Sequence, residues 1–163
     1  MNYHNIKHCD GNNGSYGIGV TLFVAGCSHG CKGCHNPQTH DPNSGIPFDN
    51  KARQEILQEL SNDWCNGLTL SGGDPLYPGN RKEILSLVQE VRTQFPNKSI
   101  WVYTGYLYDQ IKDDPTVKPI LDCCDVLVDG PFVESLKEYG LHWRGSKNQN
   151  VIDLRTGKVL EVD

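Results

Sequence analysis

The sequence contains no dense run of basic residues and no long apolar segment. Lysine and arginine number 15 against 20 aspartate and glutamate residues, which gives a formal net charge of −5. Proteins that bind the phosphate backbone need clustered basic side chains, so we expect no nucleic-acid partner. The apolar runs are far shorter than the roughly 18 residues that a membrane-spanning helix needs. Residues 1–8 also lack the apolar centre of a secretory signal, and we therefore expect a cytosolic protein without a membrane partner.

The sequence also lacks the cysteine pattern of a disulfide-bonded protein. Seven cysteines are an odd number, and they favour a reducing compartment. Those without motif spacing, which we interpret as packed thiols, are Cys9, Cys65, Cys123 and Cys124. Cys9 as a further metal ligand is a minor alternative. With 163 residues, no internal repeat and no linker, the chain is predicted to form one domain over residues 1–163.

Apolar periodicity predicts strands that alternate with helices. The strands are expected at about residues 20–25, 67–70, 99–103 and 125–128. The helices are expected at about 49–60 and 80–95, with one or two short helices at roughly 107–123, and a final hairpin at 151–154 and 159–162. Asp49 is the expected N-cap of the first helix, and Asn80 with Glu83 forms a predicted capping box for the second. Because this alternation implies parallel pairing, the predicted fold class is α/β, an open partial (β/α) barrel of about four to five βα units.

Unusual residues follow each of the four predicted strands. Three cysteines follow the first, Gly72-Gly73-Asp74 the second, Thr104-Gly105 the third and Asp129-Gly130-Pro131 the fourth. In α/β sheets and barrels, ligands bind at the carboxyl ends of the strands. We therefore expect these distant motifs to converge on one face, where Arg144 is a further candidate.

The cysteines Cys27, Cys31 and Cys34 form a C-x-x-x-C-x-x-C motif. Thiolates are soft ligands that select iron–sulfur clusters, zinc or copper(I). A structural zinc site usually takes two pairs of ligands, and no second cysteine pair with such spacing is present. A nearby histidine would complete a Cys3His zinc site, and the candidates are His29, His35 and His40. On a four-iron cluster, three thiolates leave one iron open to an external ligand, which an enzyme can use.

The cysteine motif, with Gly72-Gly73-Asp74 at the end of the next strand, resembles that of radical S-adenosylmethionine enzymes. The likeness is greatest to activases of glycyl-radical enzymes, in particular the type that activates anaerobic ribonucleotide reductase. It extends over nearly the whole chain and includes Asn2-Tyr3-His4, residues 21–24, Cys34-His35-Asn36, residues 70–76, 101–106, 126–132 and 143–146, and Asn148-Gln149. The short chain fits this type better than the longer activases of the formate-lyase type, and the implied fold is the radical S-adenosylmethionine partial barrel.

The resemblance implies two cofactors, one [4Fe–4S] cluster and S-adenosylmethionine. It assigns three irons to the thiolates of Cys27, Cys31 and Cys34, and leaves the fourth to the amino and carboxylate groups of S-adenosylmethionine. It assigns the contacts to this second cofactor to Gly33, Cys34, His35, Gly72, Gly73 and Asp74. His35 stands where the family usually has tyrosine or phenylalanine, and Asp74 where the wider superfamily has glutamate. No catalytic residue beyond the cluster ligands is implied.

The resemblance also implies an enzyme activity with protein partners. One electron enters the sulfonium of S-adenosylmethionine, the S–C5′ bond breaks, and the 5′-deoxyadenosyl radical takes a hydrogen atom from a glycine of the large reductase subunit. The electron is expected from a low-potential donor such as flavodoxin or ferredoxin. The irregular segments around residues 36–48 and from about residue 134 are candidate docking surfaces. The alternatives are an activase of another glycyl-radical enzyme, of the formate-lyase type, and a non-catalytic iron–sulfur or zinc module.

Overall fold

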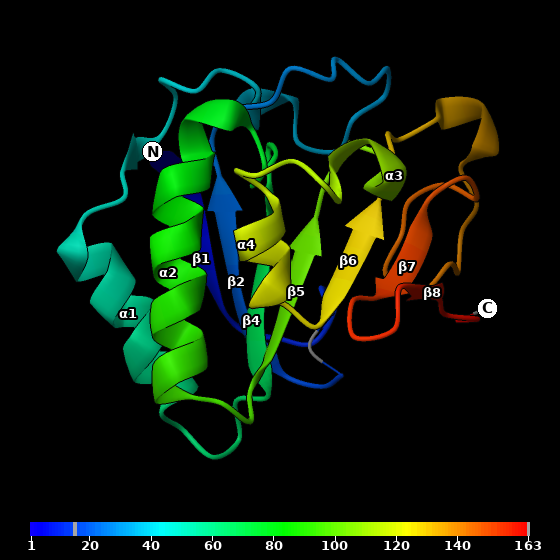
Figure 1. Ribbon diagram of the computed structural model, residues 1–163. Coiled ribbons are helices and arrows are strands. Elements are labelled where there is room, and N and C mark those ends of the chain that lie inside the picture. Colours follow the sequence, from blue (N-terminus) through cyan, green and yellow to red (C-terminus); the bar gives the residue numbers. More distant parts are fainter. Residues whose placement is uncertain (15, 163) are drawn as a thin grey trace.

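The computed structural model describes residues 1–14 and 16–162. Within these residues, eight strands form one mixed sheet in the order β3-β1-β2-β4-β5-β6-β7-β8 (Figure 1). The strands are β1 (Asn2–Asp10), β2 (Gly19–Val24), β3 (Ile46–Pro47), β4 (Gly67–Gly72), β5 (Ser99–Tyr103), β6 (Val126–Asp129), β7 (Asn150–Asp153) and β8 (Lys158–Val159). The architecture is therefore mixed α/β, as the sequence predicts at the level of fold class.

Helices cover one face of this sheet. They are α1 (Asn50–Leu60), α2 (Arg81–Gln94), α3 (Tyr108–Ile111) and α4 (Lys118–Asp122), with 3₁₀ turns η1 (Pro37–Thr39), η2 (Pro78–Asn80) and η3 (Glu134–Leu136). The predicted N-cap of α1 is confirmed, because the Asp49 side chain accepts a hydrogen bond from Ala52 N (2.9 Å). Helices α1, α2 and α4 lie on the same side of the sheet (Figure 1). Among the described residues, no helix combines the length and apolar character that crossing a bilayer requires.

The centre of the sheet is the predicted parallel unit. Strands β2, β4, β5 and β6 are neighbours and run parallel, so their carboxyl ends lie at one edge. Successive side chains of a strand point to opposite faces. Leu70 and Val102 belong to the core beneath the helices. Trp101 and Val128 belong to a second cluster, against which Tyr103 packs, so Tyr103 at the end of β5 points away from the helices.

Two local predictions are wrong. Strand β1 precedes the strand that was expected to be the first, and it pairs with β2 in antiparallel fashion. Its sequence, NYHNIKHCD, has no apolar alternation, so the pairing rather than local propensity defines it. The predicted capping box is absent at α2. Instead, Asn80 Nδ2 donates to Ala25 O (2.8 Å), which ties the start of α2 to the end of β2, and Glu83 pairs with Arg53 (2.9 Å).

Strand β1 also places Cys9 away from the cysteine motif. Asp10 pairs with Gly19, so this end of β1 lies beside the amino end of β2, whereas the motif follows the carboxyl end of β2. The main-chain nitrogen of Cys9 donates to Glu59 Oε2 (3.1 Å) of helix α1. The structure therefore does not bring Cys9 to the other candidate ligands.

The contact between β1 and α1 is expected to depend on pH. His8 Nε2 lies 2.9 Å from Glu55 Oε2, and His8 Nδ1 contacts Glu59. The hydrogen bond to Glu59 above all, and the one to Glu55 in addition, raise the pKa of His8 above 6.5. The charged ring therefore stabilises the fold fully below its unfolded pKa of about 6.5, and this contribution is lost as the pH rises through the higher folded pKa.

Denaturant unfolding across about pH 5 to 9 measures this contribution of His8 to stability. The contribution should be modest, because the His8 side chain is 46% exposed to solvent. The stability difference between wild type and His8→Gln should be largest at low pH and shrink as the pH rises. His4→Gln is the matched control, because His4 on the same strand bonds to the hydroxyl of Ser44 instead of a carboxylate. A difference between wild type and His8→Gln that does not change with pH would contradict the assignment.

Candidate functional site

A cavity of about 400 Å³ opens at the carboxyl ends of the four parallel strands. Each of the four strand ends contributes to its walls, and the contributing residues are the three motif cysteines after β2, Ser71, Gly72 and Gly73 at β4, Thr104 and Gly105 after β5, and Gly130 after β6. The predicted convergence of the motifs is therefore confirmed. The volume lies within the range of small-molecule sites, roughly 300–1,000 Å³.

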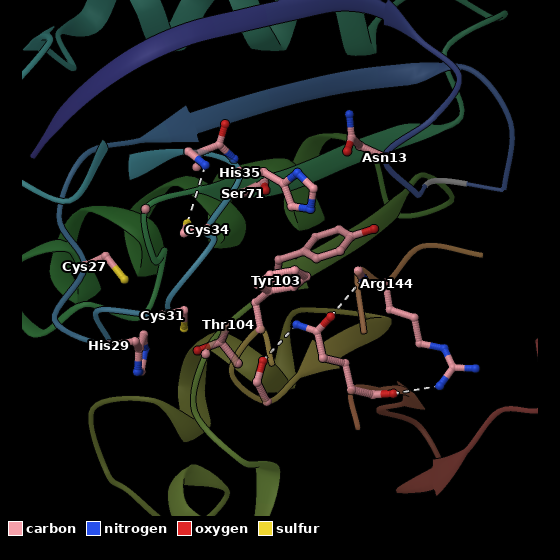
Figure 2. A pocket seen from close by; sticks show the side chains of 18 of the residues that line it. Asn13, Cys27, His29, Cys31, Cys34, His35, Ser71, Tyr103, Thr104 and Arg144 are labelled. Carbon is pink, nitrogen blue, oxygen red and sulfur yellow. Dashed lines mark hydrogen bonds between the residues drawn. The ribbon is translucent and has the colours of Figure 1, made fainter. Parts of the chain in front are cut away.

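The three motif cysteines line this cavity as free thiols. Figure 2 shows Cys27, Cys31 and Cys34 on one side of the cavity, with Asn13 and Arg144 on the other. Within the described residues, no three histidine, cysteine or acidic side chains surround one point as a single metal ion would require. Cysteines that bind a four-iron cluster each ligate a different iron, so their sulfur atoms do not meet at one point.

The surroundings of Cys27 affect the ionisation of its thiol. Burial raises the pKa of the Cys27 thiol, and a hydrogen bond with the main chain of His29 offsets only part of this effect. Without metal the thiol is therefore protonated at neutral pH. Because metals bind the thiolate, loading of this position must release a proton.

The start of the cysteine loop is held by main-chain hydrogen bonds from two sides. Gly26 N donates to Thr39 O (2.7 Å), and Cys27 N donates to His40 O (3.0 Å). From the other side, Asp74 N donates to Gly26 O (2.7 Å). The loop is thus clamped between the turn that follows the motif and the end of β4.

The close approach of these segments explains both glycines at the end of β4. A Cβ atom on Gly73 would lie 2.6 Å from Gly26 O and 2.8 Å from Thr39 O. Gly72 has a φ of +101°, and a Cβ atom there would lie 2.4 Å from Val24 N. Both glycines line the cavity, so they offer main-chain groups to a ligand without interposed side chains.

Asp74 lies behind the cavity wall and does not line the cavity. Its side chain is 1% exposed, and its carboxylate accepts hydrogen bonds from His29 Nε2 (2.5 Å), Thr104 Oγ1 (2.9 Å), Gly105 N (3.0 Å) and Leu76 N (2.8 Å). The carboxylate is thus occupied by protein partners. Because His29 and Thr104 do line the cavity, Asp74 positions two side chains of the wall.

Of the other predicted cofactor contacts, Cys34 and His35 line the cavity, whereas Gly33 does not. The His35 ring packs edge-on against Phe132, with 5.2 Å between ring centroids, and Phe132 is also part of the wall. Gly33 has a φ of +76°, and a Cβ atom there would lie 3.0 Å from the carboxyl carbon of Glu134. Glycine at this position therefore serves the turn of the cysteine loop.

Two asparagines that sequence analysis did not single out also line the cavity. Asn12 and Asn13 belong to the glycine-rich segment before β2. The buried carboxylate of Asp10 accepts hydrogen bonds from Asn12 N (2.9 Å) and Asn13 Nδ2 (2.5 Å), and from Thr21 Oγ1 (2.7 Å). The only signal for these asparagines in the sequence is Asp10, an acidic residue directly before the glycine-rich loop. Asp10 is the last residue of strand β1, which the sequence analysis did not predict.

The wall away from the cysteines also carries the polar side chains of Tyr103 and Arg144. Burial above all, and the Asp10 carboxylate in addition, raise the pKa of Tyr103 well above 10, so its hydroxyl stays protonated. Arg144 Nη1 donates to Lys147 O (3.2 Å) and Gln149 O (3.0 Å). The side chain of Arg144, a predicted candidate, is thus anchored in the wall.

Asp129, another candidate from the strand ends, does not line the cavity. Its carboxylate accepts hydrogen bonds from Tyr108 N (2.8 Å) and Asn150 N (3.1 Å). It therefore joins the segments that flank the end of β6.

The two tryptophans of the second core cluster differ in their exposure to the cavity. Trp101 is fully buried, whereas Trp143 lines the cavity.

The residues present fit a four-iron cluster. Three thiols from one loop and the glycines of β4 line the same cavity. The nearby histidines make other contacts: His29 Nε2 bonds to Asp74, and His40 Nε2 lies 3.4 Å from Cys34 Sγ. These contacts suit histidines that support metal ligands without being ligands themselves.

Comparisons with known proteins point to the same chemistry. Residues 13–152 match the model of a family described as a 4Fe-4S single cluster domain. The chain is 46% identical over 157 residues to the anaerobic ribonucleoside-triphosphate reductase-activating protein of Escherichia coli K12, covering 95% of this chain and 100% of that protein. The proteins of the same name from Enterobacteria phage T4 and Haemophilus influenzae are 44% and 43% identical, over 93% and 91% of this chain and 93% and 96% of theirs. No solved structure matches this chain.

The mixed sheet, the cavity at its strand ends and the matched model define an α/β protein with a 4Fe-4S single-cluster domain. The identity to the named relatives extends over nearly their whole lengths. The chain belongs to the family of anaerobic ribonucleoside-triphosphate reductase-activating proteins. The family predicted from the motifs is therefore confirmed.

Proposed function

We propose that this chain activates anaerobic ribonucleotide reductase by reductive cleavage of S-adenosylmethionine at a [4Fe–4S] cluster. Its relatives carry the name of reductase-activating proteins, and the proposal extends that activity to this chain. The observation that carries it is the single cavity shared by the motif cysteines and the main chain of Gly72 and Gly73. When bound, the two cofactors supply a one-electron reduction and a carbon radical that removes a hydrogen atom from a glycine of the reductase.

The proposal gives each wall of the cavity a role. Cys27, Cys31 and Cys34 would hold three irons of the cluster, and the fourth iron would be left to S-adenosylmethionine. Main-chain carbonyl groups of Gly72 and Gly73 would accept hydrogen bonds from its ammonium group. The predicted open partial (β/α) barrel of the radical S-adenosylmethionine type would consist of the parallel unit of the sheet and its helices.

The reductase must cover the cavity for the radical to be protected from water. We propose that it docks on the segment after β6, where exposed apolar side chains lie close in sequence to residues of the cavity wall. Leu136 and Tyr139 are exposed, Tyr139 to 89%, while Leu141 and Trp143 line the cavity. The electron would come from a low-potential flavodoxin or ferredoxin.

Anaerobic reconstitution with iron and sulfide tests the proposal. The protein should become brown, and addition of dithionite and S-adenosylmethionine should yield 5′-deoxyadenosine. Incubation with the large subunit of an anaerobic ribonucleotide reductase should then give a glycyl-radical doublet in electron paramagnetic resonance. A formate lyase serves as the second substrate, because a doublet only on that protein would favour the other activase type.

Two further outcomes would end the enzyme assignment. A colourless protein with stoichiometric zinc would indicate a zinc module. A stable cluster that yields no 5′-deoxyadenosine would indicate a non-catalytic iron–sulfur protein.

Replacement of His35 by tyrosine is expected to be tolerated, because it restores the usual aromatic residue of the family. The His35 ring already packs edge-on against Phe132, and a tyrosine ring can make the same contact. The apparent Kd for S-adenosylmethionine should change less than about threefold, which corresponds to well under 1 kcal/mol. His35→Ala removes the ring and should weaken binding more strongly. Equal losses in both variants would show that the imidazole itself has a role.

A further inference from the structure

Cys34 differs from the other motif cysteines in having two nitrogen donors directed at its sulfur atom. The main-chain nitrogen of Asn36 lies 3.4 Å from Cys34 Sγ, and His40 Nε2 lies at the same distance of 3.4 Å. Cys27, by comparison, forms a hydrogen bond with the main chain of His29. His40 is therefore a side chain in contact with a sulfur atom that the proposed function assigns to the cluster.

The position of the His40 ring is set by the same turn that clamps the cysteine loop. Turn η1 begins after Asn36 and includes Pro37, and His40 N donates to Pro37 O (3.3 Å). The Thr39 hydroxyl donates to Asn36 O (2.6 Å) and closes the turn. His40 O also accepts the hydrogen bond from Cys27 N, which joins the turn to the cysteine loop.

The chemistry of a ligated thiolate determines the direction of this hydrogen bond. A cysteine sulfur bound to iron has no proton and can only accept, so His40 must carry its proton on Nε2. One-electron reduction, with the electron taken from an external low-potential reductant, adds one negative charge to the cluster and its thiolates. An N–H donor stabilises this more negative state more than the oxidised state, and hydrogen bonds to sulfur are among the factors that set cluster potentials.

We propose that His40 is a positioning residue that hydrogen-bonds to the Cys34 thiolate and raises the reduction potential of the cluster. The inference rests on the proposed function, because it takes Cys34 as a cluster ligand. It gives the turn after the motif an electronic role in addition to its structural one. Reduction of the cluster by the electron donor is thereby made easier.

The test is a redox titration of the reconstituted protein without S-adenosylmethionine, monitored by electron paramagnetic resonance. His40→Leu removes the donor and should shift the midpoint potential to a more negative value. His40→Gln keeps an N–H group at a similar reach and should restore most of the wild-type potential. His4→Leu is the matched control, because His4 lies on β1 outside the cavity wall and bonds to the Ser44 hydroxyl, and it should leave the potential unchanged.

A second measurement on the wild-type protein covers the case in which His40→Leu fails to hold a cluster. Histidine labelled with ¹⁵N in its ring should give a hyperfine coupling of His40 to the reduced cluster in pulsed electron paramagnetic resonance, and the part of the signal that His40 contributes should be missing from His40→Gln. Equal potentials in wild type, His40→Leu and His40→Gln, or a wild-type cluster without the coupling, would overturn this inference alone. A wild-type protein that holds no cluster would overturn the proposed function as well.

Discussion

Replacement of Cys31 by alanine is expected to remove the cluster and all activity that depends on it. In the proposed function, the Cys31 thiolate is the protein ligand of one iron, and among the described residues only Cys27, Cys31 and Cys34 place cysteine sulfur in the cavity wall. The loss of activity should therefore exceed the roughly 100-fold that removal of an outer partner of a metal ligand costs. Because Cys31 lines the cavity and is no part of the hydrophobic core, the free energy of unfolding without cluster should change by less than about 1 kcal/mol.

Iron and sulfide analysis after anaerobic reconstitution, the visible spectrum and the yield of 5′-deoxyadenosine measure this effect. Cys123→Ala is the control, because Cys123 is also a partly buried free thiol but caps α4, far from the motif in sequence. It should retain the full cluster content. A brown Cys31→Ala protein with the wild-type rate of cleavage would refute the ligand assignment.

The convergence of the motifs on one cavity could be predicted from the sequence. The alternation of strands and helices can be read from the sequence, and it determines how strands that are distant in sequence pair. Apolar strands that alternate with amphipathic helices must pair in parallel, and parallel pairing places the residues after each strand at one edge. The motif cysteines, Gly72, Gly73 and Thr104 therefore meet although up to about 80 residues separate them. The pairing of β2, β4, β5 and β6 is the part of the fold that carries this prediction.

Features that depend on side-chain partners could not be predicted in the same way. Asn80 and Glu83 have the spacing of a capping box, but Asn80 forms a buried hydrogen bond to Ala25 O and Glu83 pairs with Arg53. In both cases, a partner that is distant in sequence replaces the local hydrogen bond of the capping box. Strand β1 was missed for a related reason, because its polar sequence becomes a strand only through pairing with β2.

Asp74 illustrates the same limit inside the site. The sequence places it directly after the two glycines, which favours a direct contact with the cofactor. The structure instead surrounds its carboxylate with hydrogen-bond donors from three strand ends, among them His29 and Thr104. Spacing alone indicates that a residue belongs to a site, whereas its partners determine whether it faces the ligand or supports the wall.

Replacement of Asp74 by alanine is accordingly expected to weaken both the fold and cofactor binding. It leaves His29, Thr104 and two main-chain N–H groups without their buried acceptor. Unsatisfied buried groups cost about 1–3 kcal/mol each, and partial rearrangement reduces the sum, so the free energy of unfolding should fall by about 2–4 kcal/mol. Because His29 and Thr104 then lose their fixed positions in the wall, the apparent Kd for S-adenosylmethionine should rise at least about tenfold, or 1.4 kcal/mol.

Asp129→Ala is the matched control, since Asp129 is also a buried carboxylate at a strand end with two main-chain donors and no place in the cavity wall. It should destabilise the fold but change the apparent Kd less than about twofold. Asp74→Asn keeps one acceptor oxygen for some of the groups that donate to Asp74. It should therefore recover part of the lost stability and part of the lost cofactor binding. Denaturant unfolding and equilibrium binding at matched cluster content separate the two effects. If Asp74→Ala and Asp129→Ala weakened binding equally, the effect would be one of general stability, and the positioning of His29 and Thr104 by Asp74 would have no part in cofactor binding.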